Sequence, residues 1–206
     1  MWLGPLRRPD DRRSKGCGGM DQDLVVRVQN GDQRAFETLT VTDYPRLFRV
    51  AHGVLGDRGL AEDATQEAFL DIWRDIRRLR EPAKYEGWSY RLLVRVCYAE
   101  AKRQPKWLTG DEVSPADEPR ATDAYRAVAD RDQLERGFQH LSMDHRVVLV
   151  LRFLLGMTTE QVAETLGVSR WTVYSRLERA TTAMRAAVEA GDRPITRHAD
   201  RQEALR

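Results

Sequence analysis

The sequence TTEQVAETLGVSRWTVYSRLERA occupies residues 158–180 and contains two amphipathic segments separated by a glycine. The first segment has the spacing of a short helix. Gly167 then supplies a turn position at which a positive φ is tolerated, and Ser169 can cap the following helix through its hydroxyl group. That helix directs Val173 and Leu177 inward. This spacing is typical of a DNA-binding helix-turn-helix, whose second helix enters the major groove.

The outward face of the second helix carries arginine and aromatic side chains. Arginine pairs bidentately with guanine edges or holds phosphates, so we predict that this face binds DNA. The candidate contacts are Ser169, Arg170, Trp171, Tyr174, Ser175, Arg176 and Arg179. A helical hairpin with a solvated basic face is the alternative explanation. For Trp171, packing on a neighbouring helix is preferred over contact with thymine methyl groups or with a regulator.

Helical spacing recurs along the rest of the chain, and strand patterns are nearly absent. We expect a short helix from about Asp21 and longer helices over roughly 32–55, 59–79 and 84–104. Pro45 lies inside the range 32–55, so a kink or a break is expected there. The predicted fold class is all-α, with two small helical domains joined by a flexible acidic linker.

Changes in composition predict the domain boundaries. The first residues are rich in Arg, Gly and Pro and lack periodicity. Met20 directly precedes the first helical pattern, which leaves open whether translation begins at Met1 or at Met20. The expected division is a disordered extension over 1–19, a first domain over 20–105, a linker over 106–122, a helix-turn-helix domain over 123–190 and a flexible tail over 191–206.

The distribution of charge carries more information than the formal net charge of +2. Residues 77–103 hold eight basic and three acidic side chains, and residues 170–185 hold four basic and one acidic. Residues 109–123 reverse the balance, with five acids against one arginine. Two basic zones that flank an acidic connector fit a protein that touches nucleic acid at two places.

Several classes of protein are disfavoured by composition. No stretch approaches the ~20 apolar residues that cross a bilayer, and the N-terminal segment lacks the apolar core of a signal peptide. Cys17 and Cys97 show no metal-ligand spacing, so we expect two reduced thiols in a cytoplasmic protein. The four histidines have no nucleophile or paired carboxylate around them, and no glycine-rich phosphate loop is visible. We therefore expect neither catalysis by this chain alone nor a cofactor.

A specific resemblance covers roughly residues 21–190. The segment LSMDHRVVLVLR (141–152), the helix-turn-helix and the segment SRLERA (175–180) together resemble the promoter −35-binding domain of the sigma-70 family. The similarity is greatest to its extracytoplasmic-function (ECF) branch, which keeps only two domains. It implies a winged-helix-like domain of the sigma region 4 type. The family usually has glycine and lysine where this chain has Trp171 and Tyr174, which leaves the −35 sequence unpredicted.

Residues 61–73 are similar to the family's polymerase-binding helix, which docks on a coiled coil of the largest core subunit. One face of this helix is a polar patch with an apolar centre, a composition that suits a helix-on-helix interface. The residues implied to bind core polymerase are Asp63, Gln66, Glu67 and Leu70. Taken alone, an acidic amphipathic helix is more often a solvated face.

Residues 85–95 correspond to the family's loop and helix that hold the −10 element and open the duplex. Aromatic faces beside cations stabilise unstacked bases, by roughly 1–3 kcal/mol per base. The implied −10 contacts are Tyr85, Trp88, Arg91, Arg95, Lys102 and Arg103. The aromatic residues could instead be core residues, and for Trp88 core packing is preferred. The family usually has an arginine-asparagine pair where Val94 and Arg95 stand, and an aspartate near Ala99.

The resemblance implies a sigma factor with RNA polymerase core and promoter DNA as partners, no membrane insertion, and in many relatives an anti-sigma protein. Two alternatives stay open. One is an ordinary helix-turn-helix regulator whose N-terminal helices sense a ligand or dimerise. The other is a sigma-like adaptor that binds polymerase but cannot melt DNA.

Overall fold

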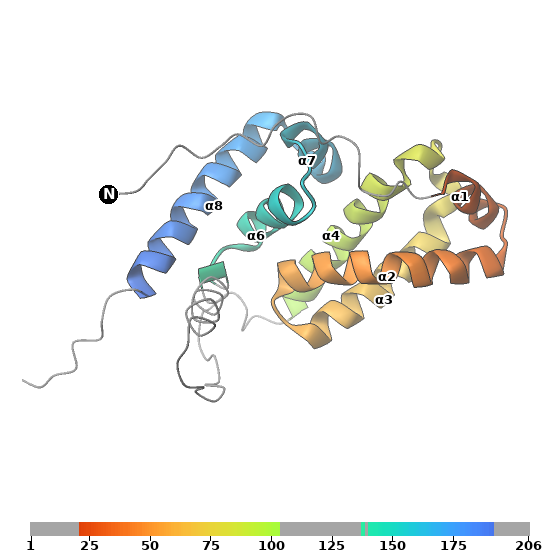
Figure 1. Cartoon of the computed structure of the whole chain (residues 1–206), viewed down its shortest axis with the longest axis horizontal. Helices are drawn as coiled ribbons and strands as arrows, with labels where there is room; N and C mark the ends of the chain where they lie inside the picture. Colours follow the sequence, from red (N-terminus) through yellow and green to blue (C-terminus); the bar gives the residue numbers. More distant parts are fainter. Residues whose placement is uncertain (1–20, 104–136, 139, 192–206) are drawn as a thin grey trace, which may run out of the picture.

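A computed structural model describes residues 21–103, 137–138 and 140–191. Within these ranges the chain forms helices and turns but no strand, which confirms the all-α class. The predicted N-terminal extension and acidic linker lie outside the described residues, as does the tail beyond Gly191. We call residues 21–103 the first module and residues 140–191 the second module, and Figure 1 shows the two groups of helices lying against one another.

The first module consists of four α-helices and two short 3₁₀ turns. Helices α1 and α2 are followed by α3, which leads through the turns η1 and η2 into α4. Their bounds are α1 Gln22–Gln29, α2 Gln33–Leu55, α3 Arg58–Asp75, η1 Ile76–Arg78, η2 Pro82–Lys84 and α4 Tyr85–Arg103. Helix α2 packs against α1, α3 and α4, so it is the central element of this module.

Short polar side chains fix the helix ends in the first module. The Asp32 carboxylate accepts a hydrogen bond of 3.0 Å from the backbone N–H of Ala35, and Asp57 accepts one of 2.7 Å from Leu60. These caps satisfy backbone donors that have no partner within the helix. Helix α2 ends at Gly56, whose φ of 73° is in the left-handed region that glycine adopts without steric penalty.

Of the kink or break expected at Pro45, the break does not occur, because α2 continues from Gln33 to Leu55 with the proline inside it. A proline removes one hydrogen bond from the helix and crowds the preceding turn. Beyond this position Leu47, Val50 and Val54 are all fully buried. Packing of this apolar face therefore outweighs the local penalty, as tertiary contacts commonly do for helices.

The second module is the predicted helix-turn-helix with one preceding helix. It contains α6 (Met143–Leu149), the π-helical turn η4 (Val150–Leu154), α7 (Thr159–Leu166) and α8 (Arg170–Gly191). Helix α8 packs against both α6 and α7. Val162, Val173 and Ala180 fill the space between these helices and are buried. The stripe on α8 that faces inward is therefore the one that the apolar spacing predicts.

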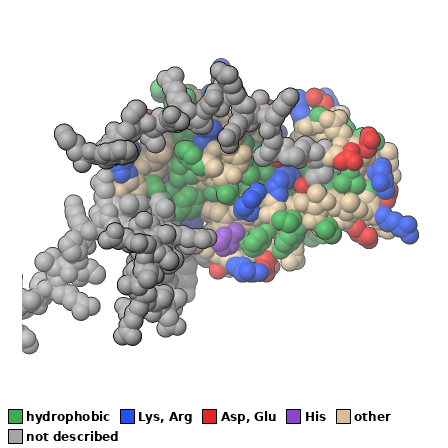
Figure 2. Space-filling view, in the orientation of Figure 1, with side chains coloured by type: hydrophobic (Ala, Val, Ile, Leu, Met, Phe, Trp, Pro, Cys, Tyr) green, Lys and Arg blue, Asp and Glu red, His purple; other side chains and the backbone are tan. Residues whose placement is uncertain are grey.

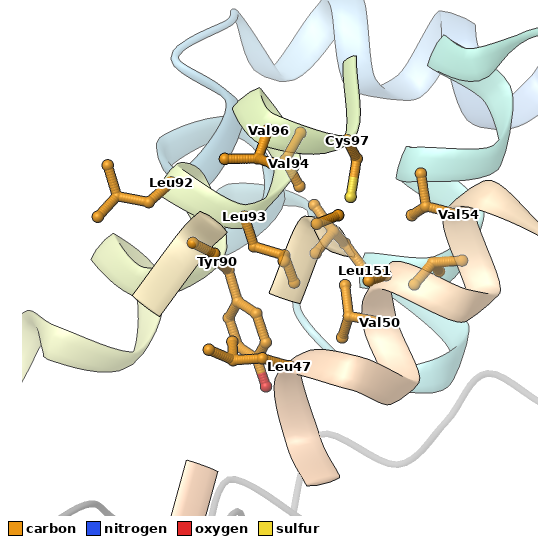
Figure 3. Packing of buried hydrophobic residues seen from close by; sticks show 14 of the residues in the cluster. Leu47, Val50, Val54, Tyr90, Leu92, Leu93, Val94, Val96, Cys97 and Leu151 are labelled. Atoms are coloured by element: carbon orange, nitrogen blue, oxygen red, sulfur yellow. The ribbon is translucent and has the colours of Figure 1, made fainter. Parts of the chain in front are cut away.

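The two modules share one hydrophobic core. Leu151 of η4 lies among Val50 and Val54 of α2 and Leu93 of α4, and all four side chains are fully buried (Figure 3). Helix α4 also packs against α7 and α6, and α2 packs against α6. Composition and spacing predict the two helical domains but not this contact, because periodicity shows which face of a helix is apolar and not which distant helix covers it.

Candidate nucleic-acid and protein interfaces

Backbone hydrogen bonding fixes the geometry of the helix-turn-helix. Gly167 has a φ of 67°, and the Ser169 hydroxyl accepts a hydrogen bond of 3.1 Å from the backbone N–H of Thr172. Both the predicted turn position and the predicted cap are confirmed. Helix α7 begins with a reciprocal capping box, in which Gln161 N–H donates to the Thr158 hydroxyl at 3.2 Å and Thr158 N–H donates to the Gln161 side chain at 2.8 Å. The spacing Thr-x-x-Gln in the sequence is the pattern that predicts such a box.

The first turns of α8 present aromatic side chains to solvent. Trp171 is 80% exposed and Tyr174 is 67% exposed. The preferred interpretation of Trp171 as a packing residue is therefore wrong. Its position on the helix explains the error: Val173 faces the core, and Trp171 lies two residues away on the opposite side of the helix. Arg170 is exposed beside it and lies 3.5 Å from Glu160 of α7.

The remaining candidates on α8 differ in how freely they face solvent. Arg179 is exposed, whereas Ser175 is half-buried. The Arg176 guanidinium lies 2.7 Å from the Asp144 carboxylate of α6 and is about a quarter exposed. Arg176 is thus held by an acid of its own module. The candidate −35 surface that is open to solvent is formed by Ser169, Arg170, Trp171, Tyr174 and Arg179.

The candidate polymerase-binding residues lie together on one face of α3. Asp63, Gln66, Glu67 and Leu70 are all exposed, and the apolar residues of the opposite face, such as Ala64, are buried. Trp73, which is not among the predicted residues, is 38% exposed and packs against Phe36 of α2 with ring centroids 4.7 Å apart. Its spacing of three residues from Leu70 could have predicted that the two side chains adjoin.

Two of the candidate −10 residues are core residues. Tyr85 is 1% exposed, and its burial raises the pKa of its hydroxyl. It cannot stack on an unpaired base in this arrangement, so its assignment to the DNA surface is corrected. Trp88 is half-buried, packs against the core, and has its ring centroid 6.2 Å from that of Tyr85. Its preferred interpretation as a packing residue agrees with this position.

The basic residues of α4 fall into two groups. Arg91 donates a hydrogen bond of 3.1 Å to the backbone carbonyl of Thr165 and another to that of Glu164. These carbonyls belong to the last turn of α7, where the helix dipole favours a cation. Arg95, Lys102 and Arg103 are exposed further along α4. The second group is open to DNA phosphates, and Arg91 is occupied by α7.

Two of the exposed cations of α4 have acidic neighbours, and one departure from the family pattern is buried. Arg95 lies 3.4 Å from Asp71 of α3, and Arg103 lies 2.5 Å from Glu100. The carboxylate of each pair is largely buried, but the Arg95 side chain is 66% exposed and the Arg103 side chain is 71% exposed, so both guanidinium groups stay accessible. Val94 is 4% exposed, so its difference from the family pattern affects packing and not the DNA-facing surface.

A hydrogen-bonded network that the sequence did not predict links the modules. The Tyr98 hydroxyl of α4 donates to the Asp144 carboxylate at 2.5 Å, and the same carboxylate pairs with Arg176 of α8. Burial, followed by the hydrogen bond to Asp144 and then by the charge of that carboxylate, raises the pKa of Tyr98. One acid therefore joins a candidate −10 helix to the candidate −35 helix.

A buried charged cluster holds α2 against α4. Arg46 lies 2.8 Å from Asp43 and 3.2 Å from Glu86, and its guanidinium sits 4.6 Å from the centre of the Tyr90 ring. Burial is the largest single effect and acts to lower the pKa of Arg46, but Asp43 and Tyr90 together outweigh it and the net shift is upward. Because Asp43 is only 2% exposed, this pair is structural.

On the face seen in Figure 2, acidic, basic and hydrophobic side chains of the first module are interspersed.

Comparison with known proteins assigns both modules. The family model for sigma-70 region 2 matches residues 40–106, and the model for sigma-70 region 4 matches residues 131–184. The chain belongs to the sigma-70 family. This sigma factor is 29% identical to the RNA polymerase sigma-H factor of Pseudomonas aeruginosa, over 87% of this chain and 97% of that protein. It is 28% identical to the ECF RNA polymerase sigma-E factor of Escherichia coli K12, over 80% and 92% respectively.

These matches make the chain an ECF-type RNA polymerase sigma factor, which is a transcription initiation factor. The match of region 2 to the N-terminal helices separates it from an ordinary helix-turn-helix regulator.

Solved structures share the fold of this sigma factor. The structure of CnrH in complex with the cytosolic domain of CnrY superposes with a TM-score of 0.60 at 22% identity, over 82% of this chain and 97% of that chain. The sigma factor RpoE in complex with the anti-sigma factor NepR from Bartonella quintana superposes with a TM-score of 0.57 at 19% identity, over 75% of this chain and 96% of that chain.

Among the described residues, no helix combines the length and apolar character that crossing a membrane requires.

Proposed function

We propose that this sigma factor binds the core polymerase through α3, the −10 region through α4 and the −35 element through α8, and that it promotes melting of the promoter duplex. The observation that carries the proposal is the coincidence of all four candidate core-binding residues on one exposed face of α3. The proposed domain functions follow the expected division, with residues 20–105 for core and −10 binding and residues 123–190 for −35 binding.

The exposed face of α3 has the composition of a specific protein interface. Leu70 is 57% exposed at its centre, Trp73 adjoins it, and Asp63 and Glu67 provide charges at the rim. An apolar centre contributes binding free energy when it is desolvated, and rim charges select the partner. A face of this kind fits the coiled coil of the largest polymerase subunit, which is itself helical.

Exposed cations support the two DNA contacts. Arg95, Lys102 and Arg103 follow one another along α4, and Arg170 and Arg179 lie on α8. Each phosphate that these side chains neutralise releases a counterion, so the binding is expected to weaken steeply with salt. The half-buried Trp88 is the one aromatic residue of the −10 set that retains partial access to solvent.

We also propose a cytoplasmic location and an anti-sigma partner. A sigma factor acts where polymerase and DNA are, and a solved protein of the same fold was determined in complex with an anti-sigma factor. The surfaces most suited to such a partner are those that polymerase and promoter would otherwise use. The chain acts without a cofactor and without catalysis of its own.

The proposal is tested by run-off transcription with purified core polymerase on a genomic promoter library. Specific start sites are expected only when this chain is added. Leu70→Asp should abolish association with core, because it places a charge at the apolar centre of the α3 face. Arg179→Ala should weaken −35 binding and lower the salt slope by about one ion, while core association is retained.

Three outcomes separate the alternatives. Absence of any specific start, together with a failure to bind core polymerase, would overturn the proposal. Core binding without melting, measured as permanganate reactivity of unpaired thymines, would identify a sigma-like adaptor. Equal loss of core and promoter binding in Arg179→Ala would indicate misfolding, which is checked by thermal unfolding of the same sample.

A further inference from the structure

Two aromatic side chains stand uncovered at the beginning of the second helix of the helix-turn-helix. Trp171 is 80% exposed and Tyr174 is 67% exposed among the residues that the structure describes. The two residues are three positions apart, so their side chains are neighbours on one face of α8. The buried Val173 lies on the opposite side, toward α6 and α7. The pair therefore forms a small apolar surface that points away from the protein.

Single exposed apolar residues are common on proteins, but adjoining large ones mark surfaces that bind something. The surroundings of this pair specify the partner. Arg170 and Arg179 are exposed on the same helix, and the helix begins directly after the Ser169 cap. Cations and a helix N-terminus favour an anionic partner. The partner must therefore present negative charge around an apolar contact.

The major groove of DNA has this combination of properties. Phosphates line the groove, and thymine is the one base whose major-groove edge carries an exposed methyl group. The N-terminal residues of a recognition helix are those that contact base edges. We propose that Trp171 and Tyr174 determine −35 specificity by packing on thymine methyl groups. This inference rests on the proposed function of α8.

The spacing of the two rings limits where those thymines lie. Residues three apart on a helix are separated by about 5–6 Å between their Cβ atoms, and successive base pairs rise by about 3.4 Å. The two side chains therefore reach adjacent or next-adjacent base pairs. The two rings therefore cover two or three consecutive base pairs of the −35 element. At least one of these base pairs is expected to contain a thymine, on either strand.

The test removes the methyl groups and nothing else. A promoter found by the run-off assay is resynthesised with deoxyuridine in place of each −35 thymine in turn, and binding of the reconstituted holoenzyme is measured. Uracil keeps the Watson–Crick and hydrogen-bonding edges of thymine. At one or two positions the wild-type holoenzyme should bind uracil DNA about fourfold more weakly per methyl, the factor expected for burying one such group.

The variants then assign that loss to the two rings. Trp171→Ala and Tyr174→Ala should bind thymine DNA more weakly and should no longer distinguish it from uracil DNA. Tyr174→Phe keeps the ring and should keep the discrimination. Arg179→Ala serves as the matched control, because it should weaken binding to both DNAs by the same factor. Since both aromatic residues are exposed, the thermal unfolding midpoints should stay close to that of the wild type.

The outcomes separate this inference from the proposed function. If no specific promoter is found, the proposed function fails before methyl groups are tested. If specific promoters are found but uracil substitution has no effect, the inference is overturned and the proposed function stands. The inference is equally overturned if Trp171→Ala and Tyr174→Ala retain the full difference between thymine and uracil. It is also overturned if they alter the binding of a protein partner while promoter binding is unchanged.

Discussion

The hydroxyl of Tyr98 and the carboxylate of Asp144 lie 2.5 Å apart, across the junction between the two modules. The same carboxylate holds Arg176 at 2.7 Å, so a single acid connects α4, α6 and α8. Each of these helices contributes a candidate DNA contact or supports one. The network therefore couples the packing of the modules to the position of a candidate −35 residue.

We expect Tyr98→Phe and Asp144→Asn to be non-additive. A hydrogen bond to a charged acceptor contributes roughly 1.5–3 kcal/mol, and partial exposure of Asp144 reduces this toward about 1 kcal/mol. Each single variant should lower the free energy of unfolding measured in urea. The double variant should lose about 1 kcal/mol less than the sum of the two losses. Additivity within about 0.3 kcal/mol would show that the two side chains do not interact in solution.

Two glycines provide a matched test of how closely the modules pack. A Cβ at Gly53 of α2 would lie 3.2 Å from a Val150 methyl group, whereas a Cβ at Gly87 of α4 would lie 3.8 Å from the Thr165 hydroxyl. Alanine gains up to about 1 kcal/mol of helix propensity at either site. Only Gly53→Ala should lose that gain to crowding, so Gly87→Ala should be the more stable variant by about 1 kcal/mol in urea unfolding.

A larger residue at the first of these positions extends the test. Gly53→Leu should force α2 and η4 apart and increase the radius of gyration measured by small-angle X-ray scattering. If the Gly53 and Gly87 alanine variants are equally stable, and Gly53→Leu leaves the scattering unchanged, then the close contact does not persist in solution.

Removing one partner of the buried cluster should be strongly destabilising. Arg46→Met leaves the Asp43 carboxylate buried without its cation, which is expected to lower the free energy of unfolding by about 3 kcal/mol. The double variant Asp43→Leu with Arg46→Met should recover much of that loss. Arg74→Met is the control, because the Arg74 side chain is largely exposed and Asp71 keeps a second cation in Arg95, so the loss should be under about 0.5 kcal/mol. Equal losses for Arg46→Met and Arg74→Met would contradict the assignment.

The thiol of Cys97 should be inert in the folded protein. It is fully buried, and burial raises its pKa to about 12, from an ordinary value of 9.0. In a Cys17→Ser background, a disulfide reagent at pH 8 should react only as the chain unfolds, because the thiolate is the reactive species. Rapid modification under native conditions would show that this part of the core opens.

The same thiol should give a defined dependence of stability on pH. Between about pH 9 and pH 12 the unfolded chain loses the Cys97 proton while the folded chain retains it, so its contribution to stability falls as pH rises. Relative to the parent, Cys97→Ala should therefore show a shallower decline in unfolding free energy across this interval. Parallel curves for the two proteins would contradict the raised pKa.

The features that sequence predicts well here are governed by local rules. The left-handed turn at Gly167 and the cap at Ser169 depend on neighbouring backbone groups, and both are found where expected. The exposed face of α3 follows from helical periodicity. Tyr85 and Trp171 were misjudged because an aromatic residue suits a core and a binding surface equally well. Only the position of each residue around its helix, fixed by tertiary packing, decides between them.

Arg91 illustrates a second limit. A cation in a basic segment predicts contact with phosphate. Nothing in the sequence around Arg91 indicates that its side chain contacts the carbonyls of Glu164 and Thr165, more than seventy residues away. The contact exists because the two modules pack together, which depends on the complementary shapes of α2, α4 and η4. Helical spacing contains no information about such complementarity.

The core that the modules share around Leu151 has a thermodynamic consequence for any binding partner that requires the modules to separate. A ligand that requires the two modules apart binds only the fraction of molecules already separated, so its apparent affinity is lower than its intrinsic affinity by that fraction. Substitutions at the junction should then raise or lower the apparent affinity of such a ligand without contacting it. Residues that contact neither DNA nor polymerase could therefore set how strongly this sigma factor supports transcription from its promoters.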